Sequence, residues 1–182
     1  MKNDRALFVL ALVLVLAAGD LASSAQQAPA SAKRLIWVYL YPSDEAGPEG
    51  RAISQRAARE NALALVPVQR EVSVVSPARG ALEALIAGPT VDEKTRGLLA
   101  PYTEGLTITN LKIINGTARV SLASSCGDCP PRFPDDLAVW RFTEAINRAL
   151  KQFPNVRRVM ICLDGFEDYG ELNHAPTKRC EF

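Results

Sequence analysis

The sequence contains a single histidine, His174, among its 182 residues. Histidine is the usual general base near neutral pH and the commonest protein ligand of transition metals, so this scarcity removes most catalytic triads and most metal sites from consideration. His174 lies in a polar segment, where we expect a solvated loop residue. Asp164, Glu167 and Asp168 do not have the spacing of a calcium loop and are typical of a solvated turn. We therefore expect no catalytic residue, metal or cofactor.

The sequence also has no excess of charge of one sign, with 21 basic and 20 acidic residues. This balance argues against a nucleic-acid partner and against a polybasic membrane surface. A loose basic cluster occurs at Arg51, Arg56 and Arg59, within a segment of helix formers that we interpret as a surface excursion. Its simplest interpretation is a solvated face, and the alternative is contact with an acidic or polymeric partner.

A hydrophobic run long enough to cross a membrane is missing as well. The apolar stretch at residues 6–18 is closed by Asp20 and spans about 13 residues, short of the roughly 18 to 20 that a spanning helix needs. Lys2 and Arg5 precede it and small residues follow, so residues 1–25 are predicted to be an export signal. An uncleaved anchor is the alternative, and it would provide the only membrane contact.

After the export signal we expect a short linker, residues 26–33, and one domain, residues 34–182. The predicted location is periplasmic, extracellular or associated with the cell envelope. Position 20 is Asp where a lipoprotein would carry its modified cysteine, so we do not expect lipidation.

Cysteine is missing from the first half of the chain and occurs at Cys126, Cys129, Cys162 and Cys180. An even number of cysteines in an exported chain predicts disulfides, and of the three pairings we favour Cys162 with Cys180 and Cys126 with Cys129. A zinc site would need a second close pair. The C-G-D-C spacing also permits an exported thiol-disulfide oxidoreductase, although prolines separate Cys129 from the next helix and keep both sulfurs out of its first turn.

The clearest positive signal lies in residues 81–122. A helical patch ends at Gly88-Pro89, where glycine accepts a left-handed conformation and proline cannot continue the helix. Thr90 and Glu93 have the spacing of a capping box, which predicts a new helix start. Asn115-Gly116 separates two strand-like runs, residues 106–114 and 117–122, and predicts a tight β-hairpin.

The remaining elements are predicted from periodicity. A second long helix is expected at residues 135–153, and further strands at residues 34–41, 63–75 and 156–163. Residues 34–41 are apolar on both alternating faces, which indicates a central strand that is covered on both sides or whose edges are protected. Pro67 indicates a bend or an edge position. Trp37 and Trp140 are expected in the core. The predicted class is α+β, a mixed or antiparallel sheet of about five strands with two main helices on one face.

The order of these elements resembles the GerMN module, which is named after bacterial spore-germination proteins. The residues that carry the resemblance are Val66-Pro67-Val68, Arg70-Glu71-Val72, Ala81 to Leu85, Gly88-Pro89-Thr90, Glu93, Gly97-Leu98, Gly105 and Ala118 to Leu122. It covers about 130 residues. The family usually has Asp where this chain has Ser121, and it lacks the C-G-D-C sequence.

The resemblance implies a compact, noncatalytic module of exported envelope proteins, including proteins of sporulation and germination. We therefore expect the chain to bind or help assemble another component of the cell or spore envelope, through a sheet edge or a helix face. The component would be an unidentified envelope protein or a cell-wall polymer. A wall hydrolase would require a deep pocket with convergent polar groups, which the sequence does not indicate.

Overall fold

The computed structural model of the chain describes residues 32–43, 47–60, 63–125, 133–170 and 175–181. The predicted export signal, most of the predicted linker, Cys126, Cys129 and His174 lie outside these residues, so their predictions stay predictions. Within the described residues, every helix is too short or too polar to cross a membrane.

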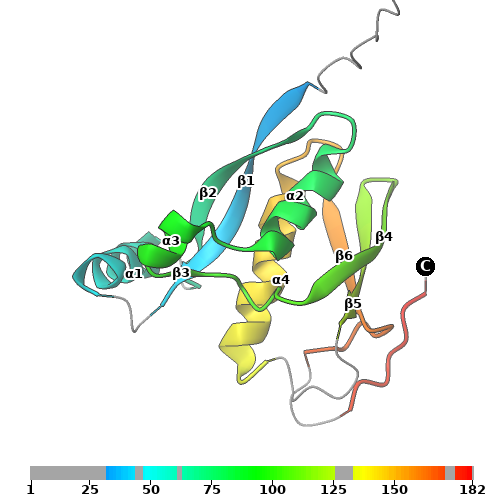
Figure 1. The fold of residues 1–182 in the computed structure, drawn as a ribbon. Helices are drawn as coiled ribbons and strands as arrows, with labels where there is room; N and C mark the ends of the chain where they lie inside the picture. Colours follow the sequence, from blue (N-terminus) through cyan, green and yellow to red (C-terminus); the bar gives the residue numbers. More distant parts are fainter. Residues whose placement is uncertain (1–31, 44–46, 61–62, 126–132, 171–174, 182) are drawn as a thin grey trace, which may run out of the picture. The chain divides into compact units, whose positions relative to one another are not determined.

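The first sheet contains three antiparallel strands in the order β2-β1-β3 (Figure 1). Strand β1 (Lys33–Pro42) lies in the middle, between β2 (Val66–Ser73) and the short β3 (Leu98–Leu99). Pro67 of β2 lies opposite Tyr39 of β1. Because β2 lies at the edge of the sheet, the missing N–H of Pro67 leaves no further strand without a hydrogen-bond partner. The edge position predicted from this proline is confirmed.

The second sheet contains β4 (Leu106–Ile114), β5 (Thr117–Ser124) and β6 (Arg158–Leu163), in that order. Strands β4 and β5 form the predicted hairpin, in which Asn115 and Gly116 have φ values of 51° and 79°. Strands β5 and β6 are parallel, and helix α4 (Asp136–Lys151) connects them. A parallel neighbour requires such a crossover, so this sheet is mixed.

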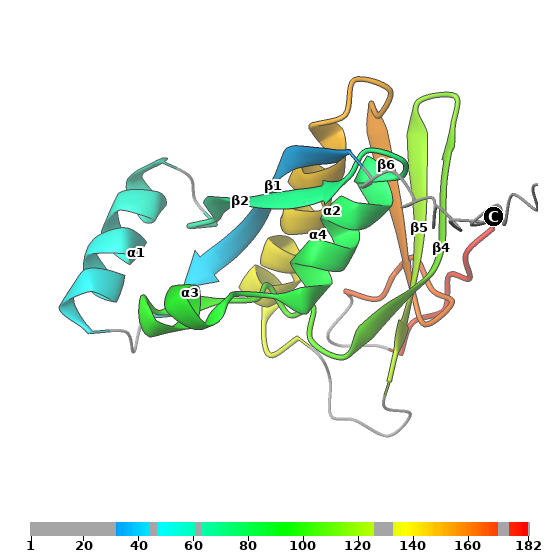
Figure 2. The ribbon, with the colours of Figure 1, turned by 45° about the horizontal axis from the view of Figure 1, so that its top comes forward.

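Helices α2 (Pro77–Ala87) and α4 contact each other and both sheets, and they lie between the sheets (Figures 1 and 2). Their buried faces meet buried side chains from β1 and β5. The largest fully buried core residues of these elements are Leu82, Leu85, Phe142, Ile146, Leu150, Ile36, Leu40, Val38 and Val120. The α+β class is confirmed. The strands are divided between two three-stranded sheets, because periodicity identifies strands without determining which of them pair.

Two further helices complete the described elements. Helix α1 (Pro48–Glu60) follows β1 and forms the segment that was predicted to be a surface excursion. Helix α3 (Val91–Thr95) follows α2. Helix α2 ends at Gly88, which has a φ of 73°, and Thr90 caps α3 as predicted. Asp135 caps α4 by accepting a hydrogen bond from the Ala138 N–H at 2.7 Å.

The expected core positions of both tryptophans are wrong. Trp37 is 43% exposed and Trp140 is 64% exposed. Trp37 lies on the face of β1 opposite to Ile36 and Val38, and in the described part of the chain no second layer covers that face at its position. Trp140 lies on α4 outside the buried stripe that contains Phe142 and Ile146. An apolar residue in a periodic segment can therefore lie beside the buried stripe instead of within it.

Candidate interaction surface

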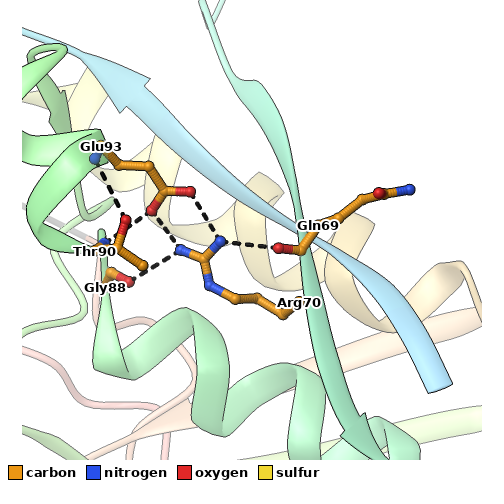
Figure 3. Close-up of polar contacts among 5 residues, drawn as sticks. All are labelled: Gln69, Arg70, Gly88, Thr90 and Glu93. Carbon is orange, nitrogen blue, oxygen red and sulfur yellow. Dashed lines mark hydrogen bonds and ion pairs between the residues drawn. The ribbon is translucent and has the colours of Figure 1, made fainter. Parts of the chain in front are cut away.

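A partly buried ion pair joins Arg70 of β2 to Glu93 of α3 (Figure 3). The guanidinium donates to Glu93 Oε1 at 2.8 Å and to Oε2 at 2.5 Å, and also to the backbone carbonyls of Gln69 at 3.0 Å and Gly88 at 3.5 Å. The side chains are only 18% and 12% exposed. Such a two-point contact fixes orientation as well as distance. It fastens the edge strand β2 to the turn between α2 and α3.

Glu93 also completes the capping box of α3. Its Oε2 accepts a hydrogen bond from the Thr90 N–H at 2.8 Å, and the Thr90 hydroxyl accepts one from the Glu93 N–H at 3.3 Å. Hydrogen bonding from Arg70 holds the pKa of the Glu93 carboxyl below its ordinary value, against the opposing effect of burial. Both carboxylate oxygens are occupied by protein donors, so Glu93 acts as a structural acid and not as a catalytic base.

The carboxylates near the C-terminus also have individual partners. Asp164 accepts from the N–H and hydroxyl of Ser124, each at 2.7 Å. Asp168 Oδ2 accepts from two backbone N–H groups, at residues 177 and 178, and Glu167 pairs with Lys178. Among the described residues, no group of three acidic, cysteine or histidine side chains could hold a metal ion.

The predicted Cys162–Cys180 disulfide is present, with a Cα–Cα distance of 6.0 Å. It ties the C-terminal segment to β6. The Cys180 N–H also donates to the Gly165 carbonyl at 3.0 Å. Because Cys126 and Cys129 lie outside the described residues, their predicted pairing is untested.

A groove of about 230 Å³ lies between α4 and β6. Its polar lining includes Thr143 and Tyr169, whose hydroxyls are hydrogen bonded to each other at 3.1 Å, and Glu167, which is ion paired with Lys178. Burial raises the pKa of Tyr169. Thr143 and Tyr169 are thus partnered with each other and Glu167 with Lys178, and Asn147 is the remaining polar residue of the lining.

The outer face of strand β1 is the most distinctive surface in this part of the fold. Alternate residues Ile36, Val38 and Leu40 are buried against the helices, whereas Leu35 and Trp37 point the other way and are 59% and 43% exposed. Glu71 and Gln69 of β2 lie opposite Leu35 and Trp37, and both are exposed. We call this surface, formed by Leu35, Trp37, Tyr39, Pro67, Gln69 and Glu71, the β1–β2 outer face.

Helix α4 borders this outer face along the edge of β1 that β2 does not occupy. The Gln152 side chain follows α4 directly, accepts a hydrogen bond from the Trp37 N–H at 2.9 Å and donates one to the Trp37 carbonyl at 2.8 Å. Arg148 lies over the ring of Tyr39, 5.7 Å from its centre. Trp37 therefore has a fixed backbone and an exposed indole, beside an aromatic ring that an arginine partly covers.

Arg51, Arg56 and Arg59, the predicted partner-contact residues, are all exposed on α1. Around the helix, Arg59 lies between the other two, about 60° from Arg56 and about 80° from Arg51. Sequence reasoning identified these cations but missed Leu35 and Trp37. The available signal is the run of apolar residues on both faces of β1, which is also typical of a strand with a second covering layer or protected edges.

Residues 38–168, more than two thirds of the chain, match the Germane family, described as "Sporulation and spore germination". The chain belongs to the Germane family. Curated protein sequences contain no significant match to it.

Two solved structures are similar to this Germane chain. The tandem GerMN domains of the sporulation protein GerM from Bacillus subtilis are 17% identical over 87% of this chain and 50% of theirs, with a TM-score of 0.47. The chain thus spans half the length of that structure. A candidate lipoprotein from Clostridium perfringens is 17% identical over 73% of this chain and 76% of its own, with a TM-score of 0.39.

Several of the residues that carry the GerMN resemblance meet in the cluster of Figure 3. Arg70, Gly88, Thr90 and Glu93 come from β2, from the end of α2 and from the start of α3. In this Germane chain they hold these elements together. Their part in the resemblance therefore has a structural explanation and does not require a ligand.

Proposed function

We propose that this Germane protein is an exported, noncatalytic module that binds an envelope protein through its β1–β2 outer face. The observation that carries the proposal is the exposed pair Leu35 and Trp37 on a strand whose other face buries Ile36, Val38 and Leu40. Tryptophan, tyrosine and arginine are the residues that most often dominate the energy of protein interfaces. Trp37, Tyr39 and Arg148 place these three types side by side.

The free energy of binding a partner should be favourable at the β1–β2 outer face. Its backbone is already ordered by pairing with β2 and by Gln152, so a partner would not have to order the strand. Burying a large apolar side chain from water contributes about 1.5 to 3 kcal/mol. Trp37 and Leu35 together could therefore supply a substantial part of the binding energy, with the exposed polar residues of β2 at the rim.

Export to the envelope supports the same proposal. The N-terminal sequence predicts secretion, and the Cys162–Cys180 disulfide is of the kind that oxidising compartments favour. Family membership supports a role in the envelope, with sporulation or germination as the setting where the organism forms spores.

Site-specific photo-crosslinking in the native host tests the proposal. We would replace Gln69, which lies opposite Trp37, with a photo-crosslinking residue and identify the products by mass spectrometry. We expect one discrete crosslinked envelope protein, and we expect Trp37→Ser to abolish it. Trp140→Ser is the matched control, because Trp140 is also exposed but lies on α4, about 18 Å along the helix from Gln152.

Three results would contradict the proposal. They are no crosslinked protein, a crosslink that persists in Trp37→Ser, or equal loss in both tryptophan variants. Crosslinking to wall polymer alone would also contradict it, by showing that the indole stacks on a saccharide.

A further inference from the structure

Strands β4, β5 and β6 place three cations and no acid in three described rows on the outer face of the second sheet. In the register of β4, β5 and β6, one side of the sheet holds three neighbouring rows of residues. The rows are Ile114–Thr117–Arg158, Lys112–Arg119–Met160 and Asn110–Ser121–Cys162. The intervening residues Ala118, Val120 and Ile161 are buried on the opposite side, toward the helices. Lys112, Arg119 and Arg158 therefore share one face, which we call the cationic face.

Lys112 and Arg119 are direct cross-strand partners. Opposed side chains in an antiparallel pair have Cβ atoms about 5 Å apart, and like charges at that distance destabilise the sheet. Arg158 lies on the strand on the other side of β5, one row away from Arg119. Adjacent strands are about 4.8 Å apart, so the three positive charges fall within a small area.

Among the described residues, no ion pair involves Lys112, Arg119 or Arg158. Arg119 is half-buried, and its Nε is buried without a hydrogen-bond partner in the described part of the chain. A buried N–H donor without a partner costs free energy that an anion bound beside it would recover.

We propose that the cationic face binds an acidic segment of a partner protein. Charge complementarity identifies the carboxylates, and the apolar residues Ile114 and Met160 between the cations favour a peptide over a phosphate polymer. In an extended segment, alternate side chains point to one side, so carboxylates at every second position face the same cations. This surface is separate from the β1–β2 outer face and does not depend on the function proposed above.

The probe is a short fluorescent peptide of alternating glutamate and valine, titrated into the full-length protein by fluorescence anisotropy. We expect saturable binding that weakens as salt increases. The triple variant Lys112→Gln/Arg119→Gln/Arg158→Gln should bind at least about tenfold more weakly. The matched control is Arg51→Gln/Arg56→Gln/Arg59→Gln on α1, which loses the same three charges and should bind within about twofold of the wild type.

A single substitution gives a second, independent readout. Lys112→Glu places a carboxylate opposite Arg119, so it should raise the midpoint of urea unfolding while weakening peptide binding. A gain of stability shows that the variant is folded, which separates lost binding from lost structure.

Several outcomes would overturn the inference. They are no binding of the acidic peptide, equal weakening by the two triple variants, or undiminished binding by Lys112→Glu. Binding of polyphosphate without binding of the peptide would also overturn it, in favour of a polymeric anion. Trp37→Ser should leave peptide binding unchanged, so the two surfaces can fail separately.

Discussion

Arg70 and Glu93, on different elements and 23 residues apart, form a two-point ion pair whose carboxylate also caps helix α3. A single acidic side chain thus satisfies a helix start and anchors an edge strand. The two tasks are coupled, because the Glu93 rotamer that caps the helix is the one that Arg70 holds. Loss of either residue should loosen both β2 and the α2–α3 turn.

Replacing Arg70 with methionine should destabilise the protein by about 2 kcal/mol, because Glu93 would remain partly buried without its charged partner. Urea unfolding followed by circular dichroism measures this change. The control is Arg79→Met, which breaks the i,i+4 pair with Glu83, whose side chains are 47% and 58% exposed. That loss should cost less than about 0.5 kcal/mol. Equal effects of the two substitutions would contradict the structural role of Arg70.

The same ion pair predicts a dependence of stability on pH. The pKa of Glu93 is lower in the folded protein than its ordinary value of 4.5, so its contribution is present above that value. The contribution is lost as pH falls through the lower, folded pKa. The stability difference between wild type and Arg70→Met should therefore shrink on acidification. A carboxyl NMR titration should also show a higher pKa for Glu93 in Arg70→Met, and an unchanged pKa would refute this assignment.

Removing the Cys162–Cys180 bond should cost about 3 kcal/mol in the chain-entropy model, given a sequence separation of 18 residues. We would measure urea unfolding of Cys180→Ser in a Cys126→Ser/Cys129→Ser background, so that no other thiol can exchange. In the same background, reductant should destabilise the parent and leave Cys180→Ser unaffected. A parent that is indifferent to reductant would show that the bond contributes little.

The hairpin turn at Gly116 can be compared with a matched turn. Gly116 and Gly165 each follow a residue with positive φ, and their own φ values are 79° and 90°. An added Cβ meets Arg157 Nε at 2.6 Å at Gly116 and open space at Gly165. Alanine at either site should cost about 1 to 2 kcal/mol of backbone strain. We expect a further loss at Gly116, measured by urea unfolding, that disappears in an Arg157→Ala background; its persistence there would argue against the clash.

The sequence predicted those parts of the fold that depend on neighbouring residues. The end of α2 at Gly88, the Thr90–Glu93 capping box and the Asn115-Gly116 turn are local arrangements, and all three are confirmed. The α+β class followed from the order of such elements. The long-range Cys162–Cys180 disulfide, one of three possible pairings and the one that would tie the C-terminal segment to a strand, is also present.

Arrangements that depend on distant residues were not predictable in this way. The division of the strands between two sheets is decided by packing on α2 and α4, and periodicity contains no information on it. The exposure of Trp37 has the same origin. An apolar residue on a strand shows where a layer could lie, whereas the rest of the fold decides whether a layer is there.

The Gln152 amide has a consequence for assembly. Strand β3 pairs with β1 at Tyr41 and Pro42, so among the described strands none borders the rest of that edge of β1. The amide of Gln152 mimics a peptide group and occupies the Trp37 N–H and carbonyl. A β-strand from another molecule would have to displace the Gln152 side chain before that strand could pair with β1. This side chain therefore protects the protein from edge-to-edge aggregation through β1. It leaves the neighbouring indole accessible to a partner that binds the face of the sheet.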